Sequence, residues 1–133
     1  GYKQMDIRAD ELLRAIRLPR STMPRTHYYR KVGTRKAQAI SKVCFAAVAR
    51  TNGNQIEEVR IALGSVAPVP IRCAQTEAAI RTRVIDAETL QAARTALTKD
   101  ISPIDDLRST RDYRLQVSLN LLVDFLQGLT QSS

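Results

Sequence analysis

AISKVCFAAVARTNGNQIEEVRIALGSVAPVPIR, residues 39–72, contains two apolar runs separated by a turn sequence. The runs cover residues 40–49 and 59–63, and Thr51-Asn52-Gly53-Asn54 lies between them. Asn-Gly is a strong hairpin signal because a type I′ turn needs positive φ at both central residues. The stretch is therefore predicted to form a β-hairpin whose return strand begins at Ile56.

The two strands of this hairpin differ in their pattern. The return strand alternates, with Val59, Ile61 and Leu63 on one face and the charged Glu58 and Arg60 on the other. The first strand does not alternate, because both of its faces are apolar. One face carries Val43, Phe45 and Ala47, and the other carries Cys44, Ala46 and Val48. Such a strand is expected to be covered on both sides, or nearly so.

The segments before and after the hairpin predict further strands. Residues 12–19, LLRAIRLP, favour a strand over a helix because the run is short and ends in a proline. Residues 28–32 suit another strand, which Gly33 ends, and the basic loop 33–36 leads into the hairpin. Two prolines within residues 64–70 favour an extended segment at a sheet edge.

The last third of the chain predicts helices. Thr76 is a candidate N-cap for a short helix over residues 77–80, and Asp86 for a helix over residues 87–98. Ser109 and Asp112 resemble a capping box before the final helix. That helix carries leucines spaced by three and four residues at Leu115, Leu119, Leu122, Leu126 and Leu129. The predicted fold class is α+β, with an antiparallel three- to four-stranded sheet packed against about three helices.

Size and composition fit one domain over residues 1–133. The chain has 133 residues, 44% hydrophobic and 26% charged, and no apolar run approaches the roughly 20 residues that span a bilayer. No secretory segment opens the sequence. Cys44 and Cys73 are expected to be buried free thiols in a reducing cytoplasm, with a disulfide possible but not indicated. His27 is the only histidine, so a metal site built by this chain has almost no support.

Charge is distributed unevenly along the sequence. Residues 1–50 hold twelve Lys/Arg and three Asp/Glu, a net +9, whereas residues 51–133 hold nine and ten, a net −1. A solvated basic face is one explanation. An anionic partner is the other: a phosphate-bearing cofactor, an acidic protein surface or nucleic acid.

No group of residues predicts catalysis. Asp105-Asp106 lies just before a capped helix and reads as a helix-start feature without a partner base or nucleophile. Acyl-transfer and nucleotide-binding motifs are missing from the sequence. Tyr28 and Tyr29 are the only aromatics in the basic stretch over residues 20–42, which argues against nucleic acid. From the residues alone, the chain is a non-catalytic α+β module with a basic face.

Three blocks of the sequence together resemble one protein family. They are YYRKVGTRKAQAISKVCFAAVA, RIALGSVAPVPIR and SPIDDLRSTRDYRLQVSLNLLVDFL, and the opening GYKQMDIRADELLRAIRLP fits as well. The chain resembles the C-terminal domain of the FAD-binding (medium) subunit of molybdenum hydroxylases, the group of xanthine dehydrogenase and carbon monoxide dehydrogenase. The resemblance covers nearly the whole chain and does not identify a substrate.

The resemblance implies part of a multi-subunit oxidoreductase. In such enzymes electrons pass from a molybdopterin site in a large subunit, through two [2Fe-2S] clusters in a small subunit, to FAD in the medium subunit. FAD then reduces NAD or another acceptor. The N-terminal FAD-binding part, with its glycine-rich segments, lies outside this sequence. The implied partners are that part, the two other subunits and possibly NAD, with no membrane and a cytoplasmic location.

The resemblance also implies positions near the flavin. An apolar residue of the entry segment matches Leu13, which could cover the ring. The lysine before the basic loop matches Lys31, which could place a cation near the flavin's electron-rich pyrimidine end. Gly33, Thr34 and Arg35 would line the adjacent loop. The isolated domain is expected to have no catalytic residue, and the alternative function is a basic binding module for nucleic acid or an acidic protein.

Overall fold

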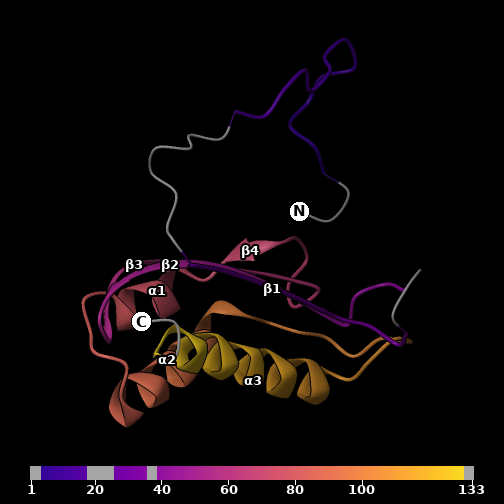
Figure 1. Ribbon diagram of the computed structural model, residues 1–133. Helices are drawn as coiled ribbons and strands as arrows, with labels where there is room; N and C mark the ends of the chain where they lie inside the picture. The colour runs from indigo at the N-terminus through magenta and orange to yellow at the C-terminus, as the bar shows by residue number, and fades with distance from the viewer. Residues whose placement is uncertain (1–3, 18–25, 36–38, 131–133) are drawn as a thin grey trace.

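The computed structural model describes residues 4–17, 26–35 and 39–130. Its antiparallel sheet has the order β1-β2-β3-β4, with β1 at Thr26–Val32, β2 at Val43–Asn52, β3 at Gln55–Gly64 and β4 at Ile71–Arg72. The helices α1, Ala74–Ile80, α2, Ala87–Asp100, and α3, Arg111–Thr130, lie on one side of the sheet (Figure 1). The predicted α+β class, with three to four strands and about three helices, is confirmed.

The central hairpin forms as predicted, but its turn differs. A register shift between Arg50 and Thr51 lets Asn52 pair with Gln55. The two residues at the centre of the turn are then Gly53 and Asn54, and only Gly53 has positive φ, at 53°. This is the pattern of a type II′ turn, which places glycine first. The expected type I′ turn at Asn52-Gly53 is wrong because the bulge moves the turn by one residue.

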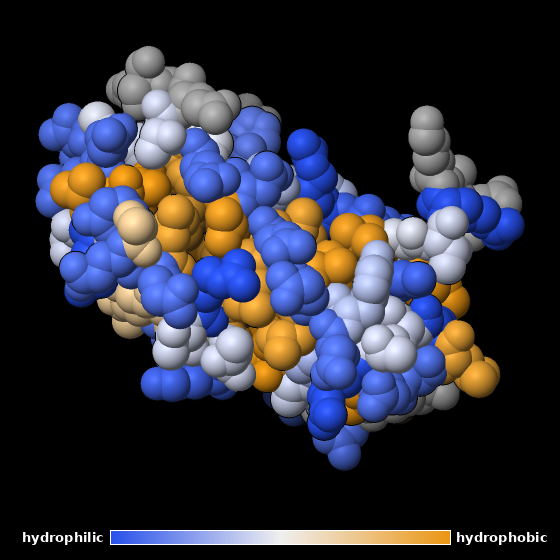
Figure 2. Space-filling model, turned by 90° about the horizontal axis from the view of Figure 1, so that it is seen from below, coloured by the Kyte–Doolittle hydropathy of each residue, from blue (hydrophilic) through white to orange (hydrophobic). Residues whose placement is uncertain are grey.

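The hydrophobic core lies between one face of the sheet and the helices. β2 and β3 contribute their alternate apolar residues, and α2 and α3 contribute their inner stripes. These side chains include Val43, Phe45, Ala47, Val59, Ile61, Leu63, Leu97, Leu122, Phe125 and Leu126. Seen from the helix side, apolar residues are visible between the polar residues of this layer (Figure 2). The leucine stripe of the last helix is confirmed, with Leu115 half-buried against the same core.

None of the described helices lies over the opposite face of the sheet. Cys44 and Val48 are half-buried and Ala46 is exposed, whereas their neighbours Val43, Phe45 and Ala47 are buried. The expectation that β2 is covered on both sides is therefore wrong within the described residues. The apolar residues on that face are small or short, so their exposure to water costs less than that of larger side chains.

The helix boundaries show which local signals operate. Asp86 caps α2 as predicted, accepting a hydrogen bond from Thr89 N at 2.8 Å. α1 begins at Ala74 rather than at residue 77, because Asp100 of α2 accepts hydrogen bonds from Gln75 N and Thr76 N. Thr76 is thus inside the helix and is not its N-cap.

The start of α3 also differs by one residue from the prediction. Thr110 Oγ1 accepts the hydrogen bond from Tyr113 N at 3.2 Å, in place of the expected box of Ser109 and Asp112. Asp105, in the connection before α3, accepts a hydrogen bond from Arg111 N at 2.7 Å. Asp105 therefore serves the helix start, as the sequence indicated.

The N-terminal segment is not a strand in its described part. Residues 12–17 have no strand partner, and Leu12, Leu13 and Ile16 are each more than 70% exposed. An apolar run forms a strand only where a neighbour supplies hydrogen bonds, and none of the described strands lies beside it. Residues 18 and 19 of the predicted strand lie outside the described residues. Residues 65–70 form neither a helix nor a strand, and the two-residue β4 follows them at the edge of the sheet.

Candidate functional site on the open face of the sheet

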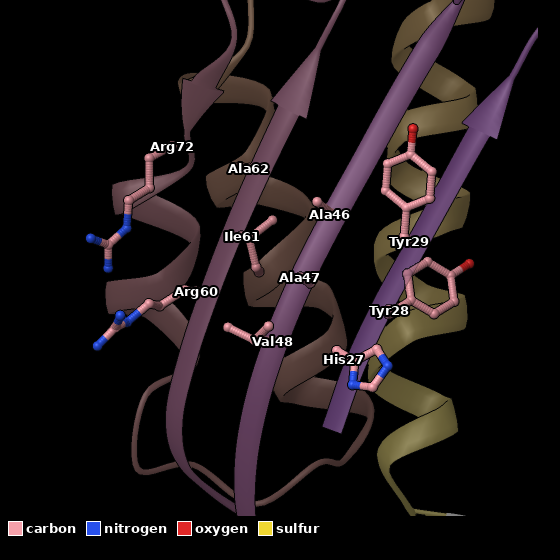
Figure 3. Close-up of a pocket in the computed structure, with 10 residues that line it drawn as sticks. All are labelled: His27, Tyr28, Tyr29, Ala46, Ala47, Val48, Arg60, Ile61, Ala62 and Arg72. Carbon is pink, nitrogen blue, oxygen red and sulfur yellow. The ribbon is translucent and has the colours of Figure 1, made fainter. Parts of the chain in front are cut away.

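The sheet face opposite the helices is called the open face. Strand register assigns its residues, because directly opposed residues in an antiparallel pair share a face. Three rows result: His27–Val48–Arg60, Tyr29–Ala46–Ala62–Arg72 and Lys31–Cys44–Gly64. Figure 3 shows most of these side chains above the strands, with α3 behind them.

A shallow depression of about 450 Å³ lies over this face. The floor of the depression consists of Ala46, Val48 and Ala62. These apolar side chains are small, so they project less from the sheet than the side chains on either side of them. His27 and Tyr29 stand on one side of the floor, and Arg60 and Arg72 on the other (Figure 3). The depression therefore combines an apolar base, aromatic and imidazole rings, and guanidinium groups.

The arginines of the open face are held by carboxylates. Arg60 Nη2 lies 2.7 Å from Glu58 Oε1. Arg72 donates from Nε and Nη2 to Glu77, with 2.8 Å between Nη2 and Oε2. The hydrogen bond from Arg72 to Glu77 raises the pKa of the guanidinium further. Both side chains keep their charge, but much of it is already neutralised.

Glu77 also completes the edge of the sheet. Beyond the short β4, the backbone N–H of Ile61 donates to Glu77 Oε1 at 2.8 Å. The carboxylate thus takes the place of a strand acceptor and joins α1, β3 and Arg72. A buried backbone donor is satisfied in this way, and the wall formed by Arg72 is fixed to the helix layer.

Lys31 occupies the end of the open face nearest the loop 33–42. It is exposed and lies opposite Cys44. Among the described residues it has no ion-pair partner, in contrast to Arg60 and Arg72. Lys31 is therefore a cation on this face without a neutralising carboxylate in the described chain.

Cys44 lies in the same row as Lys31, and Tyr29 lies in the neighbouring row. The Cys44 thiol donates to Tyr29 Oη across a distance of 3.5 Å. This contact raises the pKa of Tyr29. Cys44 and Cys73 are both free thiols, as predicted, although Cys44 is only half-buried.

The predicted site residues fall into two groups. Gly33, Thr34 and Arg35 follow β1 directly and join Lys31 at one end of the sheet. Lys42 N donates to Val32 O at 2.7 Å across the base of this loop, and a Cβ on Gly33 would lie 3.1 Å from that of Ala39. Leu13 lies elsewhere, in the N-terminal segment on the open-face side of the sheet, and is 72% exposed. The described residues do not bring Leu13 together with Lys31.

Sequence reasoning missed the other residues of the open face. Tyr29, Cys44, Arg60 and Arg72 belong to it only because of the strand register. The alternation of β3 follows from the sequence and puts Arg60 on the exposed face. The contribution of β4 could not, because it has only two residues.

The described part of the chain has neither a ligand cluster for a metal ion nor a membrane-spanning helix. Its side chains include no group of three or more His, Cys, Asp or Glu that could hold a metal ion. None of its helices combines the length and the apolar content needed to cross a membrane.

Fold and site together define a class of protein: an α+β domain whose described helices pack on one face of its sheet and leave the other face open. The chain belongs to the family of CO dehydrogenase flavoprotein C-terminal domains, whose family model matches residues 27–129. The suspected resemblance to this family is confirmed.

Curated relatives agree with this membership. The chain is 29% identical over 120 residues to the xanthine dehydrogenase FAD-binding subunit of Escherichia coli O157:H7, covering 88% of this chain and 40% of the relative. It is 30% identical over 105 residues to the carbon monoxide dehydrogenase medium chain of Hydrogenophaga pseudoflava, covering 79% and 36%. The chain thus spans about two fifths of the length of these relatives.

Solved structures share the fold. Carbon monoxide dehydrogenase from Hydrogenophaga pseudoflava, which lacks the Mo-pyranopterin moiety of its cofactor, matches with a TM-score of 0.65 and 31% identity over 72% of this chain and 33% of that one. Quinoline 2-oxidoreductase from Pseudomonas putida 86 matches with a TM-score of 0.65 and 24% identity, over 78% and 38%. At that identity the second match concerns the fold alone.

Proposed function

We propose that this chain is the C-terminal domain of the flavoprotein subunit of a molybdopterin-dependent oxidoreductase, where it completes the FAD pocket. The observation that carries the proposal is the open face, where small apolar side chains form the floor and Lys31 at one end has no ion-pair partner among the described residues. In this proposal the face packs against the N-terminal FAD-binding part of the same subunit. Large and small subunits with molybdopterin and [2Fe-2S] clusters are its further partners, in the cytoplasm.

The residues of the open face fit a flat, anionic cofactor. The middle of the open face has short side chains or none, so a planar ring system could approach the sheet closely. The residues concerned are Cys44, Ala46, Ala62 and Gly64. FAD carries a pyrophosphate, and a cation near it or near the electron-rich part of the ring is favourable. Lys31 can supply this charge at full strength because no described carboxylate pairs with it.

The role proposed for each predicted residue follows from its place. Lys31 would stabilise negative charge on the flavin, and Gly33, Thr34 and Arg35 would border the cofactor from the loop after β1. Leu13 would reach the ring from the N-terminal segment, whose apolar side chains are exposed in the described chain. When bound, FAD supplies the electron transfer from the iron–sulfur clusters to NAD or another acceptor, while the protein binds and orients it.

The test is a flavin absorbance spectrum of this chain co-expressed with the segment that precedes it in the full subunit. The unaltered pair should retain about one FAD per complex, and Lys31→Ala should weaken retention about tenfold, the equivalent of one lost charge interaction of about 1.4 kcal/mol. The flavin reduction potential should also fall in the variant, since a cation near the ring favours the reduced, more anionic form.

Lys99→Ala is the matched control, because Lys99 is an exposed lysine in the last turn of α2. It should retain flavin like the unaltered pair. A pair that never holds flavin contradicts the proposed role of the domain. Equal flavin retention in the Lys31 and Lys99 variants contradicts the proposed role of Lys31.

A further inference from the structure

A second hollow lies at one end of the molecule, where three loops meet. They are the segment before β2, the segment between β3 and β4, and the connection from α2 to α3. The groove has a volume of about 730 Å³. Ile40, Pro68 and Ile104 form apolar walls, and Asp106, Arg108 and Arg114 provide its charges. It shares no lining residue with the depression on the open face.

Arg114 holds the three loops together. Its side chain is only 4% exposed. Nη1 donates to Lys42 O at 3.2 Å and to Ser65 O at 2.7 Å, and Nη2 donates to Asp106 Oδ1 at 2.7 Å. Nε has no partner, and among the described residues it is the one buried side-chain nitrogen or oxygen in this condition. Buried donors are almost always satisfied, so this one calls for an acceptor.

One oxygen of the carboxylate in the groove is fully used by other donors. Asp106 Oδ1 already accepts from Arg108 N at 2.8 Å and Ser109 N at 3.0 Å, in addition to Arg114. These backbone hydrogen bonds, first that of Arg108, hold the pKa of Asp106 below its usual value. The Arg108 guanidinium is 3.8 Å from Asp106, too far for a strong hydrogen bond. The lining residues Arg108 and Arg114 thus share one carboxylate, which leaves a net charge of +1 among the charged groups of the groove.

The rim of the groove is unusually apolar for a surface. Ile40 is 63% exposed, Ile104 is 68% exposed, and the adjacent Leu107 is fully exposed. These side chains come from two of the three loops and surround the cationic base. Large apolar residues gathered around a polar centre are typical of a site that another chain covers.

We propose that this groove docks an extended segment of another polypeptide chain that carries an Asp or Glu between apolar residues. The partner's carboxylate pairs with the guanidinium of Arg108, whose side chain is 55% exposed. Its apolar neighbours pack on Ile40 and Ile104. The +1 charge selects the acid, and the apolar walls select a peptide over a free carboxylate. This contact adds a second interface to the one proposed for the open face and does not depend on flavin binding.

The test places a photo-cross-linking amino acid at Ile104 of the full polypeptide that carries this chain, expressed in its source organism. Mass spectrometry then identifies the cross-linked peptide. We expect a peptide of a different chain with an Asp or Glu within a few residues of apolar side chains. The same photo-cross-linker at Glu88, which is 82% exposed on α2, provides the background.

Charge reversal makes the test specific. Arg108→Glu should lower the yield of the Ile104 cross-link about tenfold, and Lys in place of the identified acid should restore it. Arg83→Glu is the control, because Arg83 is also exposed and makes a similarly loose ion pair, 3.5 Å from Glu88. The proposal is overturned if Ile104 gives no cross-link above the Glu88 background, or if the cross-linked peptide has no acid or belongs to a second copy of this chain. It is also overturned if Arg83→Glu lowers the yield as much as Arg108→Glu does.

Discussion

Tyr28 joins the edge strand β1 to helix α3 through both its ring and its hydroxyl. The ring packs against Phe45 and Phe125 with centroid distances of 5.7 Å to each. The hydroxyl donates to Asp124 Oδ2 at 2.5 Å. Because β1 also carries Tyr29 and Lys31 on its other face, this residue fixes the position of one side of the open face.

Tyr28 gives the chain an alkaline pH dependence. Burial first, and then the hydrogen bond to Asp124, raise the pKa of Tyr28 from 10.0 to about 12. The neutral phenol is therefore favoured in the folded state. Its contribution to the free energy of unfolding is complete below pH 10, where the phenol is neutral in both states, and is lost as the pH rises toward 12.

We expect Tyr28→Phe to lower the free energy of unfolding at pH 8 by about 1–2 kcal/mol, through the lost hydrogen bond to a charged group. The variant should also lose less stability than the unaltered chain between pH 10 and 12. Urea unfolding at a series of pH values measures both effects. Tyr113→Phe serves as control, and an alkaline decline that is the same in all three proteins contradicts the assignment.

At the scale of elements, the structure shows where local sequence signals are enough. The leucine spacing predicts α3, Asp86 predicts the start of α2, and Asn52-Gly53 predicts the hairpin within one residue of its turn. Each of these signals acts within a few residues of its own element. Contacts between elements decided the rest: Asp100 is 24 residues from the helix start that it caps, and the Arg50–Thr51 bulge depends on pairing with β3.

The candidate site was predictable only in part for the same reason. Lys31 and the loop 33–35 came from the resemblance to a family, and the structure places them at one end of the sheet. The open face as a whole needs the register of four strands, which no single segment specifies. Residues 12–17 of the expected strand have no strand partner among the described residues, because periodicity alone does not say what lies beside a segment.

Asp100 provides a test of the contact between α1 and α2. Its Oδ2 accepts from both Thr76 N and Thr76 Oγ1, at 2.8 and 2.7 Å, and its Oδ1 accepts from Gln75 N. We expect Asp100→Ala to lower the free energy of unfolding by about 1–2 kcal/mol, because α1 loses its only side-chain cap among the described residues. Amide hydrogen exchange should accelerate at Gln75 and Thr76.

Asp86→Ala, which removes the cap of α2, is the comparison for that experiment. It should destabilise the chain by about 1 kcal/mol without accelerating exchange at Gln75 and Thr76. If Asp100→Ala leaves the hydrogen-exchange rates of these two amides unchanged, the start of α1 does not depend on the Asp100 carboxylate of α2.

At the scale of the whole molecule, the sheet divides the chain into a face that holds the fold and a face available to a partner. Ile61 and Ala62 are neighbours on β3 and lie on opposite sides of this division. Ile61 is 1% exposed and belongs to the core, whereas Ala62 is exposed on the floor of the depression. Stability and assembly should therefore respond separately to changes at these two positions.

We expect Ile61→Ala to lower the free energy of unfolding of this chain by about 2–4 kcal/mol, through lost burial and a cavity. Ala62→Glu should change it by no more than about 0.5 kcal/mol, as for other surface substitutions. For association in the co-expressed pair, we expect Ala62→Glu to have the larger effect. A charged side chain on the apolar floor should block packing of the FAD-binding part, so the Ala62→Glu chain should remain folded but no longer associate. Urea unfolding and co-purification measure the two effects. An Ala62→Glu chain that associates normally shows that the partner covers some other surface, and an Ala62→Glu chain that unfolds shows that the open face already contributes to the stability of the domain.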